Sequence, residues 1–460
     1  MIEIAISVLV VAIVVLIYRR YRSIFSLPFF WAAVYACLYV GLLEIHAESG
    51  GSTYIYGALG FGMFFGGLLA VDFLLLRLSP AAKARSKHQH SKRDNAKPDP
   101  KPDQQRKPTR IRLLFPCLPL NVGLFVSLIG ATYITFVFFS TQGFPIFSSF
   151  PAMAWVQSTS GVINRLMTVF GPGCYASLGL IAWAVHRETG SREAKVLMYL
   201  GLGLAILAQS LLATKAAAIM IFIWFNVTLF YLNKKRDFRK SVLPFILVVV
   251  PISAAIVMVR LVSSQGYWQS GSISQTFLTR VTTEAARPVD YIVKYSNRWG
   301  FTHGGALRLE VKRVKEQLTG QTKTPILSEF VFDLMTYQPT NTTGLSAALT
   351  LGGTGYVDWG LAGLLLYSFV QGLVFGGIHR YLLRQETMSI VMVIFWGSIL
   401  NYVMAASISG TVLVGLESAL LSFVPPLILL FPFCAFFLLP VARRYRTSGD
   451  RRVSSVVSSH

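Results

Sequence analysis

The chain has 460 residues, of which 53% are hydrophobic and 13% are charged, and its mean hydropathy is +0.56. This composition excludes a soluble globular enzyme and predicts an all-α, polytopic membrane protein. The formal net charge is +22. Membrane topology and attraction to anionic inner-leaflet lipid explain that excess, so no nucleic-acid partner is expected.

Eleven apolar runs are long enough to cross a hydrocarbon core about 30 Å thick. In chain order, these predicted spans cover residues 2–18, 25–45, 54–78, 119–140, 162–185, 196–213, 216–233, 242–262, 359–380, 388–409 and 417–440. We expect the first run to be retained as a helix, because "YRRYR" follows it and no small-residue cleavage site does. The break at "ATK" within residues 196–233 predicts a hairpin of two spans.

Basic residues are distributed unevenly between the loops. The segments that together carry 30 of the 42 Lys and Arg residues are 19–24, 77–112, 186–195, 233–240, 380–387 and 443–460. The short loops that carry none are 46–53, 141–161 and 410–416. Because basic loops favour the cytoplasmic side, the N-terminus is predicted outside and the C-terminus inside, which an odd number of spans requires.

The spans and loops define a predicted organisation of the chain. Its parts are three N-terminal spans (1–78), a disordered basic cytoplasmic linker (79–112), spans four to eight (113–262), a partly helical outer loop (263–350), spans nine to eleven (351–442) and a cytoplasmic tail (443–460). The linker is Pro-rich and Lys-rich, a composition that cannot bury enough apolar surface to fold alone.

Two helices are predicted in the outer loop. Apolar residues at helical spacing, which predict a helix lying on the outer leaflet, are Leu307, Val311, Val314 and Leu318. A second helix is predicted within 274–293. There Glu284 lies one turn from Arg280 and near Arg287, and Pro288 is expected to interrupt the helix.

Several charges lie near the membrane boundary. Arg165, Lys215 and Arg260 fall at the outer ends of three hairpins, at similar predicted depth. A basic side chain at a helix centre costs about 2.5–3.5 kcal/mol and is usually kept for a partner. A bound diphosphate would explain the set, whereas snorkelling to the headgroups is the alternative. Asp72, inside the third span, is expected to pair with the nearby Arg77 or to snorkel inward.

Metal-binding patterns are absent from the sequence. Its four cysteines have no CxxC spacing and no paired acids of the DxD type occur on the outer side, so no metal or other cofactor is expected. The natural source of a diphosphate at the outer headgroup level is a lipid-linked sugar. Transfer of that sugar to an acceptor hydroxyl needs a general base. His303 lies beside two glycines in "RWGFTHGGALR", and the other candidates are Glu284, Asp290, Glu329 and Asp333.

Several stretches in order resemble the O-antigen and enterobacterial-common-antigen type polysaccharide polymerases, an oligosaccharide repeat unit polymerase family. They are "TQGFPIFSS", "GVINRLMTVFGPG" with Arg165, "SLLATKAAAIMIF" with Lys215, "FLTRVTTEAARP" with Arg280 and Arg287, and "TTGLSAALTLGGTGYVDWGLAG". The resemblance covers most of residues 120–420. This family usually carries arginine where the chain has Lys215, so the charge is kept but the bidentate fork is lost.

The resemblance implies transfer of a glycan from one undecaprenyl diphosphate to the non-reducing end of another lipid-linked repeat, in a bacterial inner membrane. We assign Arg165, Lys215 and Arg280 to the diphosphate, with Arg260 and Arg287 as further candidates. His303 is the candidate acceptor base, and Glu284 is the other catalytic candidate. Expected partners are lipid-linked oligosaccharides and membrane lipid, and a chain-length regulator protein is a candidate.

Two alternatives remain open from the sequence. An O-antigen ligase would share the architecture and chemistry but deliver the glycan to a lipid A core. A flippase or other transporter would normally show internal repeats and charges at mid-membrane. No repeat is visible here, and most charges lie outside the spans or near their ends.

Overall fold

The computed structural model describes most of the predicted bundle. The described residues are 2–78, 108–145, 166–167, 169–212, 215–234, 282–319, 325–336, 349–413, 416, 425–428, 430 and 434. Within them the regular secondary structure is helical apart from two strands of three residues.

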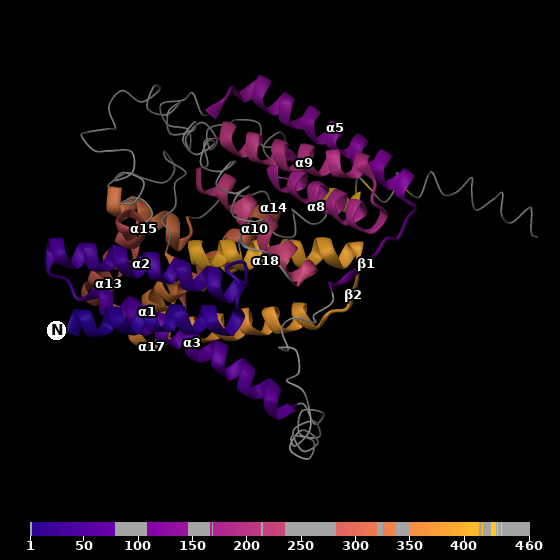
Figure 1. Cartoon of the computed structure of the whole chain (residues 1–460). Helices are drawn as coiled ribbons and strands as arrows, with labels where there is room; N and C mark the ends of the chain where they lie inside the picture. The colour runs from indigo at the N-terminus through magenta and orange to yellow at the C-terminus, as the bar shows by residue number, and fades with distance from the viewer. Residues whose placement is uncertain are drawn as a thin grey trace, which may run out of the picture.

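Seven of the described helices are long and apolar enough to cross a membrane, and Figure 1 shows them running roughly along one common direction. They are α1 (Ile2–Tyr21), α2 (Leu27–Ser49), α3 (Thr53–Leu78), α5 (Cys117–Gln142), α9 (Arg192–Leu211), α17 (Thr350–Arg384) and α18 (Ile390–Ser409). The prediction of a polytopic membrane protein is therefore confirmed. The predicted span 242–262 lies outside the described residues, as does most of 417–440, so the total of eleven stays a prediction.

Two more helices occupy predicted spans. Helix α8 (Pro172–Thr189) covers the later part of 162–185, and α10 (Lys215–Asn233) covers 216–233. Because α9 ends at Leu211 and α10 begins at Lys215 and packs against α9, the predicted break within 196–233 is confirmed.

Local sequence signals set several helix ends. The hydroxyls of Ser26, Ser191 and Ser389 each accept a backbone N–H of the first turn, in α2, α9 and α18. Helices α2 and α18 end at Gly50 and Gly410, which adopt left-handed backbone angles. Side-chain caps at the first turn and glycine just after the last turn satisfy backbone groups that would otherwise lack partners.

Helix α17 is longer than the predicted span 359–380, because it is two helices joined at Trp359 and Gly360. Gly360 has φ 61° and ψ −144°, a conformation that glycine alone adopts readily. A Cβ at Gly363 would overlap the carbonyl oxygen of Gly355. In a straight helix these residues would be about 12 Å apart. Residues 350–358 therefore fold back along the start of 361–384 as a helical hairpin.

The described part of the predicted outer loop contains three helices, α13 (Thr283–Trp299), α14 (Gly305–Thr319) and α15 (Leu327–Thr336), of which the last was not predicted. The predicted helix with the Leu307 to Leu318 spacing is confirmed as α14. The expectation that Pro288 interrupts the other helix is wrong, since α13 continues through it to Trp299. Pro288 lies near the start of α13, so it removes only one early backbone hydrogen bond.

Helix α13 is packed between spans rather than lying over them. The hydroxyls of Thr282 and Thr283 both donate to the carboxylate of Glu44 in α2. A Cβ at Gly41 would overlap the carbonyl oxygen of Thr282. Since Gly41 lies eight residues before the end of α2, α13 begins about 12 Å inward of that end.

The opposite end of the bundle carries a small sheet. Strand β1 (Arg110–Arg112) pairs in parallel with β2 (Thr387–Ser389), with Ile111 opposite Met388. In Figure 1 both strands lie at the end of the bundle away from the N-terminus, α13 and α15. The predicted linker 79–112 is thus ordered over residues 108–112, and residues 79–107 lie outside the described residues.

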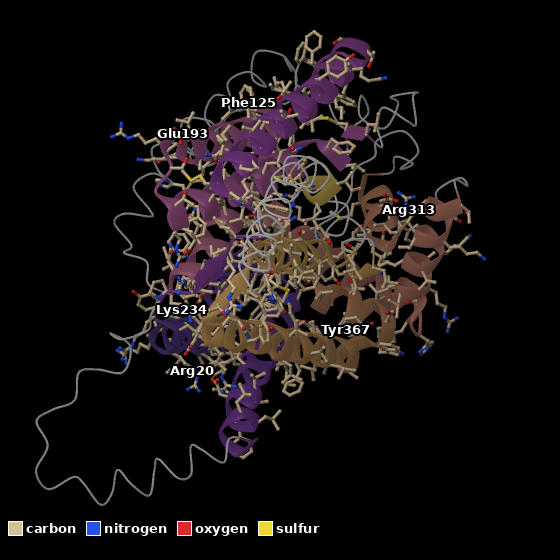
Figure 2. All side chains as sticks on the ribbon, turned by 90° about the vertical axis from the view of Figure 1, so that its right-hand side faces the viewer. Arg20, Phe125, Glu193, Lys234, Arg313 and Tyr367 are labelled. Carbon is tan, nitrogen blue, oxygen red and sulfur yellow. The ribbon has the colours of Figure 1, made fainter. Side chains whose placement is uncertain are left out.

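Asp72 is buried near this end and holds three spans together. Arg20 of α1 and Arg380 of α17 both donate to it, with Nη2 to carboxylate distances of 2.5 Å each. Arg20 is labelled in Figure 2, which looks toward this end. Asp72 was expected to pair with Arg77 or to snorkel inward; the side chain of Arg77 lies outside the described part of the structure, and the two partners seen come from other helices.

Candidate functional site

The predicted site residues differ in how far the structure describes them. Arg165, Arg260 and Arg280 lie outside the described residues. Lys215 is placed by its backbone at the start of α10, and Glu284 by its backbone in the first turn of α13. Arg287 and His303 are described fully, and both are exposed.

A small apolar cluster brings the sequence neighbourhoods of Arg165 and Lys215 together. Phe138 and Phe139 of α5 pack with Met167 and Leu212. Met167 follows Arg165 by two residues, and Leu212 precedes Lys215 by three. Sequence neighbours of two predicted cations therefore meet in one cluster, at the end of the bundle away from the strands. We call these four residues the outer cluster.

Arg287 lies on the free face of α13. Its neighbours Ala286, Val289 and Ile292 are buried against the bundle, while Arg287 is exposed. Glu284 precedes Arg287 by three residues in the same helix. The start of α13 therefore carries one predicted cation and one predicted catalytic acid in its sequence.

Two of the candidate bases have structural partners. Asp290 is buried, accepts the hydroxyl of Thr53 over 2.6 Å and pairs with Lys294 over 2.6 Å. Glu329 pairs with Arg313 and also accepts the backbone N–H of Ile326. Each carboxylate thus has structural partners that hold a helix in place. The structure describes Asp333 by its backbone in α15.

His303 lies in a tight loop between α13 and α14. Three residues of this loop have left-handed backbone angles, namely Gly300, His303 and Gly304. A positive φ at a non-glycine residue is uncommon and indicates that the surroundings hold it there. The holding contacts are backbone hydrogen bonds from Thr302 N–H to Val357 and from His303 N–H to the carbonyl oxygen of Asp358, at 3.0 and 2.9 Å.

The side chain of Asp358 fastens the same loop a second time. It is fully buried at the tip of the α17 hairpin. Its Oδ1 accepts the hydroxyl of Thr302 over 2.6 Å and the backbone N–H of Ala306 over 3.0 Å. A buried carboxylate with such donors is satisfied, and it stabilises the first turn of α14. The backbone on both sides of His303 is therefore fixed to one residue.

Glu310 joins α14 to the end of α18. Its side chain is buried, and Oε2 accepts the backbone N–H groups of Val412 and Leu413, at 2.8 and 2.6 Å. These two residues follow Gly410, where α18 ends. The loop that carries His303, the α17 hairpin and the end of α18 thus form one connected unit.

A comparison with protein-family models assigns the chain. The family described as "Putative O-antigen polymerase" matches residues 23–414. The chain belongs to this family. No curated protein and no solved structure matches the chain significantly. The resemblance stated from the quoted motifs is therefore confirmed, and the match runs from just before α2 to just past the end of α18.

Membership of the O-antigen polymerase family implies glycan polymerase activity on lipid-linked oligosaccharides. The described helices agree with a multi-pass membrane protein of such a family. Among the described residues, no group of three or more His, Cys, Asp or Glu lies close enough together to hold a metal ion.

Sequence reasoning assigned no role to Asp358 or Glu310, although the first lies in the quoted stretch "GYVDWG". An acid among glycines at the start of an apolar span is a signal that could have singled out Asp358, since a buried carboxylate needs partners. Glu310 carries no such signal, because it lies among alternating charges on an amphipathic helix.

Proposed function

We propose that this O-antigen polymerase family member transfers the glycan from an undecaprenyl diphosphate to the non-reducing end of a second lipid-linked repeat. The reaction takes place at the outer face of a bacterial inner membrane. In this proposal the bundle has eleven spans, the N-terminus is periplasmic, and no metal takes part. The end with α13, α14 and the outer cluster faces the periplasm.

The proposed site has two functions: cations bind the diphosphate, and a base takes the proton of the acceptor. Arg165, Lys215 and Arg280 bind the diphosphate, and Arg260 and Arg287 add positive charge around it. Such cations stabilise the charge that develops on the leaving group. His303 takes the proton of the acceptor hydroxyl, with Glu284 as the competing base.

The reaction balances with these groups. The acceptor oxygen attacks the anomeric carbon of the donor glycan while its proton passes to the base. The bond from that carbon to the diphosphate oxygen breaks, and undecaprenyl diphosphate leaves with the bonding electrons. The good leaving group needs charge stabilisation rather than protonation, so cations alone are sufficient for this step.

One observation carries the proposal beyond family membership: the outer cluster joins the sequence neighbours of Arg165 and Lys215. These cations are 50 positions apart in the sequence, yet the residues beside them pack together. The fastened loop at His303 supports the second role, because a catalytic group needs a rigid support.

Product analysis of a deletion strain tests the proposal. We expect lipid carriers, or core after ligation, that bear a single repeat unit. Complete loss of glycan attachment to the core would indicate a ligase instead. Repeat units that accumulate on the cytoplasmic side would indicate a transporter. Purified protein with lipid-linked repeats alone should then produce a ladder of longer glycans.

A further inference from the structure

An open apolar groove lies between α5 and α9, on the surface of the two helices that would face lipid. Its volume is about 490 Å³, within the range of ligand sites. The residues that line it are Phe125, Leu128, Ile129, Thr132, Tyr133 and Phe136 from α5, with Leu200 and Leu204 from α9. Figure 1 shows α5 at the edge of the bundle beside α9, and Phe125 is labelled in Figure 2.

The position of the groove along the helices is specific. On α5 it runs from Phe125 to Phe136, a length of about 16 Å, or roughly half of the hydrocarbon core. Two residues beyond Phe136, α5 reaches Phe138 of the outer cluster. On α9 the groove ends at Leu204, about two turns before Leu212 of the same cluster. The groove therefore leads inward from the place that Arg165 and Lys215 flank in sequence.

The lining suits a hydrocarbon chain. The hydroxyl of Thr132 donates to the carbonyl oxygen of Leu128 over 2.7 Å, so it does not offer its proton to a ligand. Three of the lining side chains are aromatic rings, which provide large apolar surface. Phe125, Tyr133 and Phe136 are all more than half exposed, and a chain in the groove would cover them.

We propose that this groove binds the polyisoprenoid chain of a lipid diphosphate whose head lies next to the outer cluster. The inference rests on the proposed function for the nature of the head group and for the cations that bind it. An amphipathic ligand with a strongly anionic head needs cations at the membrane boundary and an apolar channel directly inward of them. The outer cluster joins these two requirements. An ordinary phospholipid has a weaker negative charge, so two cations would bind its head group less tightly.

A matched pair of substitutions tests the groove. Leu200 and Leu69 are exposed to 43% and 41%, and Leu69 lies on α3 away from the groove lining. Leu200→Trp fills part of the groove, whereas Leu69→Trp adds the same ring elsewhere on a span. The probe is undecaprenyl diphosphate with a photoreactive diazirine in its chain, added to each protein in nanodiscs of phosphatidylethanolamine and phosphatidylglycerol.

We expect the probe to label peptides from α5 and α9 in the wild type and in Leu69→Trp. Unlabelled undecaprenyl diphosphate should compete, and added phosphatidylglycerol should not. Labelling in Leu200→Trp should fall about tenfold, because blocking about two methylene contacts costs that much affinity. Equal labelling in both variants, labelling elsewhere, or equal competition by phosphatidylglycerol would overturn the proposal.

An activity measurement separates this inference from the proposed function. Donors that carry a geranyl chain are too short to follow the groove far inward, so Leu200→Trp should slow transfer from undecaprenyl donors about tenfold but leave geranyl donors unchanged. Equal slowing of both donors would contradict the groove. Absence of transfer by the wild type with both donors, together with specific labelling, would contradict the proposed reaction and leave the binding site intact.

Discussion

The backbone N–H of His303 donates to the carbonyl oxygen of Asp358 over 2.9 Å, so the candidate base is attached to the tip of the α17 hairpin. The Asp358 side chain holds Thr302 and Ala306, one residue before His303 and three after it. An exposed imidazole thus stands on a backbone that cannot move freely, which is the arrangement a positioned base requires.

Removal of the Asp358 side chain should therefore lower activity by displacing His303. Asp358→Ala should lower the polymerisation rate about 10- to 100-fold, since a displacement near 1 Å can cost that much. In a His303→Gln background the same exchange should cost little more, because the group it positions is already lost. Rates of all four forms would be measured at matched, folded amounts in nanodiscs. Fully additive losses would show that Asp358 does not act through His303.

Lys215 is predicted to bind the diphosphate. Lys215→Arg should keep most activity because the charge persists, whereas Lys215→Met should raise the barrier by about 2–4 kcal/mol, on the order of 30- to 1000-fold in rate. Polymer length and rate would be measured with donor concentration varied. Lys312→Met is the matched control, since Lys312 is an exposed residue of α14. Near-normal polymer from Lys215→Met would indicate simple snorkelling to the membrane boundary.

The ion-paired Asp72 should matter for stability. Arg380→Met removes one of its two partners and should lower the free energy of unfolding by about 1–3 kcal/mol, less than for a fully buried pair because the arginine is partly exposed. Lys312→Met breaks an exposed pair with Glu316 and should cost at most a few tenths of a kcal/mol. Thermal unfolding in detergent would compare them, and equal losses would refute the structural role of Asp72.

The basic segment before β1 should be dispensable for catalysis. Replacement of residues 86–107 by a Gly/Ser segment of equal length should preserve chain extension, because this composition has no folding signature. By contrast, Ile111→Asp should destabilise the protein, since Ile111 is buried in the two-stranded sheet. Membrane expression and glycan ladders would be compared, and a catalytic loss from the first exchange at normal expression would contradict the expectation.

Polymerisation by purified protein should survive EDTA. The sequence offers no paired acids on the predicted outer side, and the cation-only scheme supplies the needed charge stabilisation. EDTA saturated with magnesium is the control for effects other than chelation. Loss of activity that added magnesium or manganese restores would reveal a metal site.

The sequence by itself determined the class of protein and much of its secondary structure. Apolar runs such as 2–18 and 119–140 predicted α1 and α5 closely, because a membrane-crossing helix needs about twenty apolar residues whatever surrounds it. The signal for the break before Lys215 was also local in the sequence, and the structure agrees with it, because α9 ends at Leu211 and α10 begins at Lys215. The motif order also gave the family, which the match over residues 23–414 confirms.

Only the tertiary structure decided which distant residues meet. Asp72 pairs with Arg20 and Arg380 from two other spans, and β1 pairs with a strand 277 positions later. The fold-back of residues 350–358 could not be predicted from hydropathy, because the same glycine-rich run is compatible with one straight helix. Local propensity and transfer energy depend on a residue and its neighbours in sequence. The partner of a buried charge and the reversal of a helix depend on packing against other elements, which the order of residues along the chain does not specify.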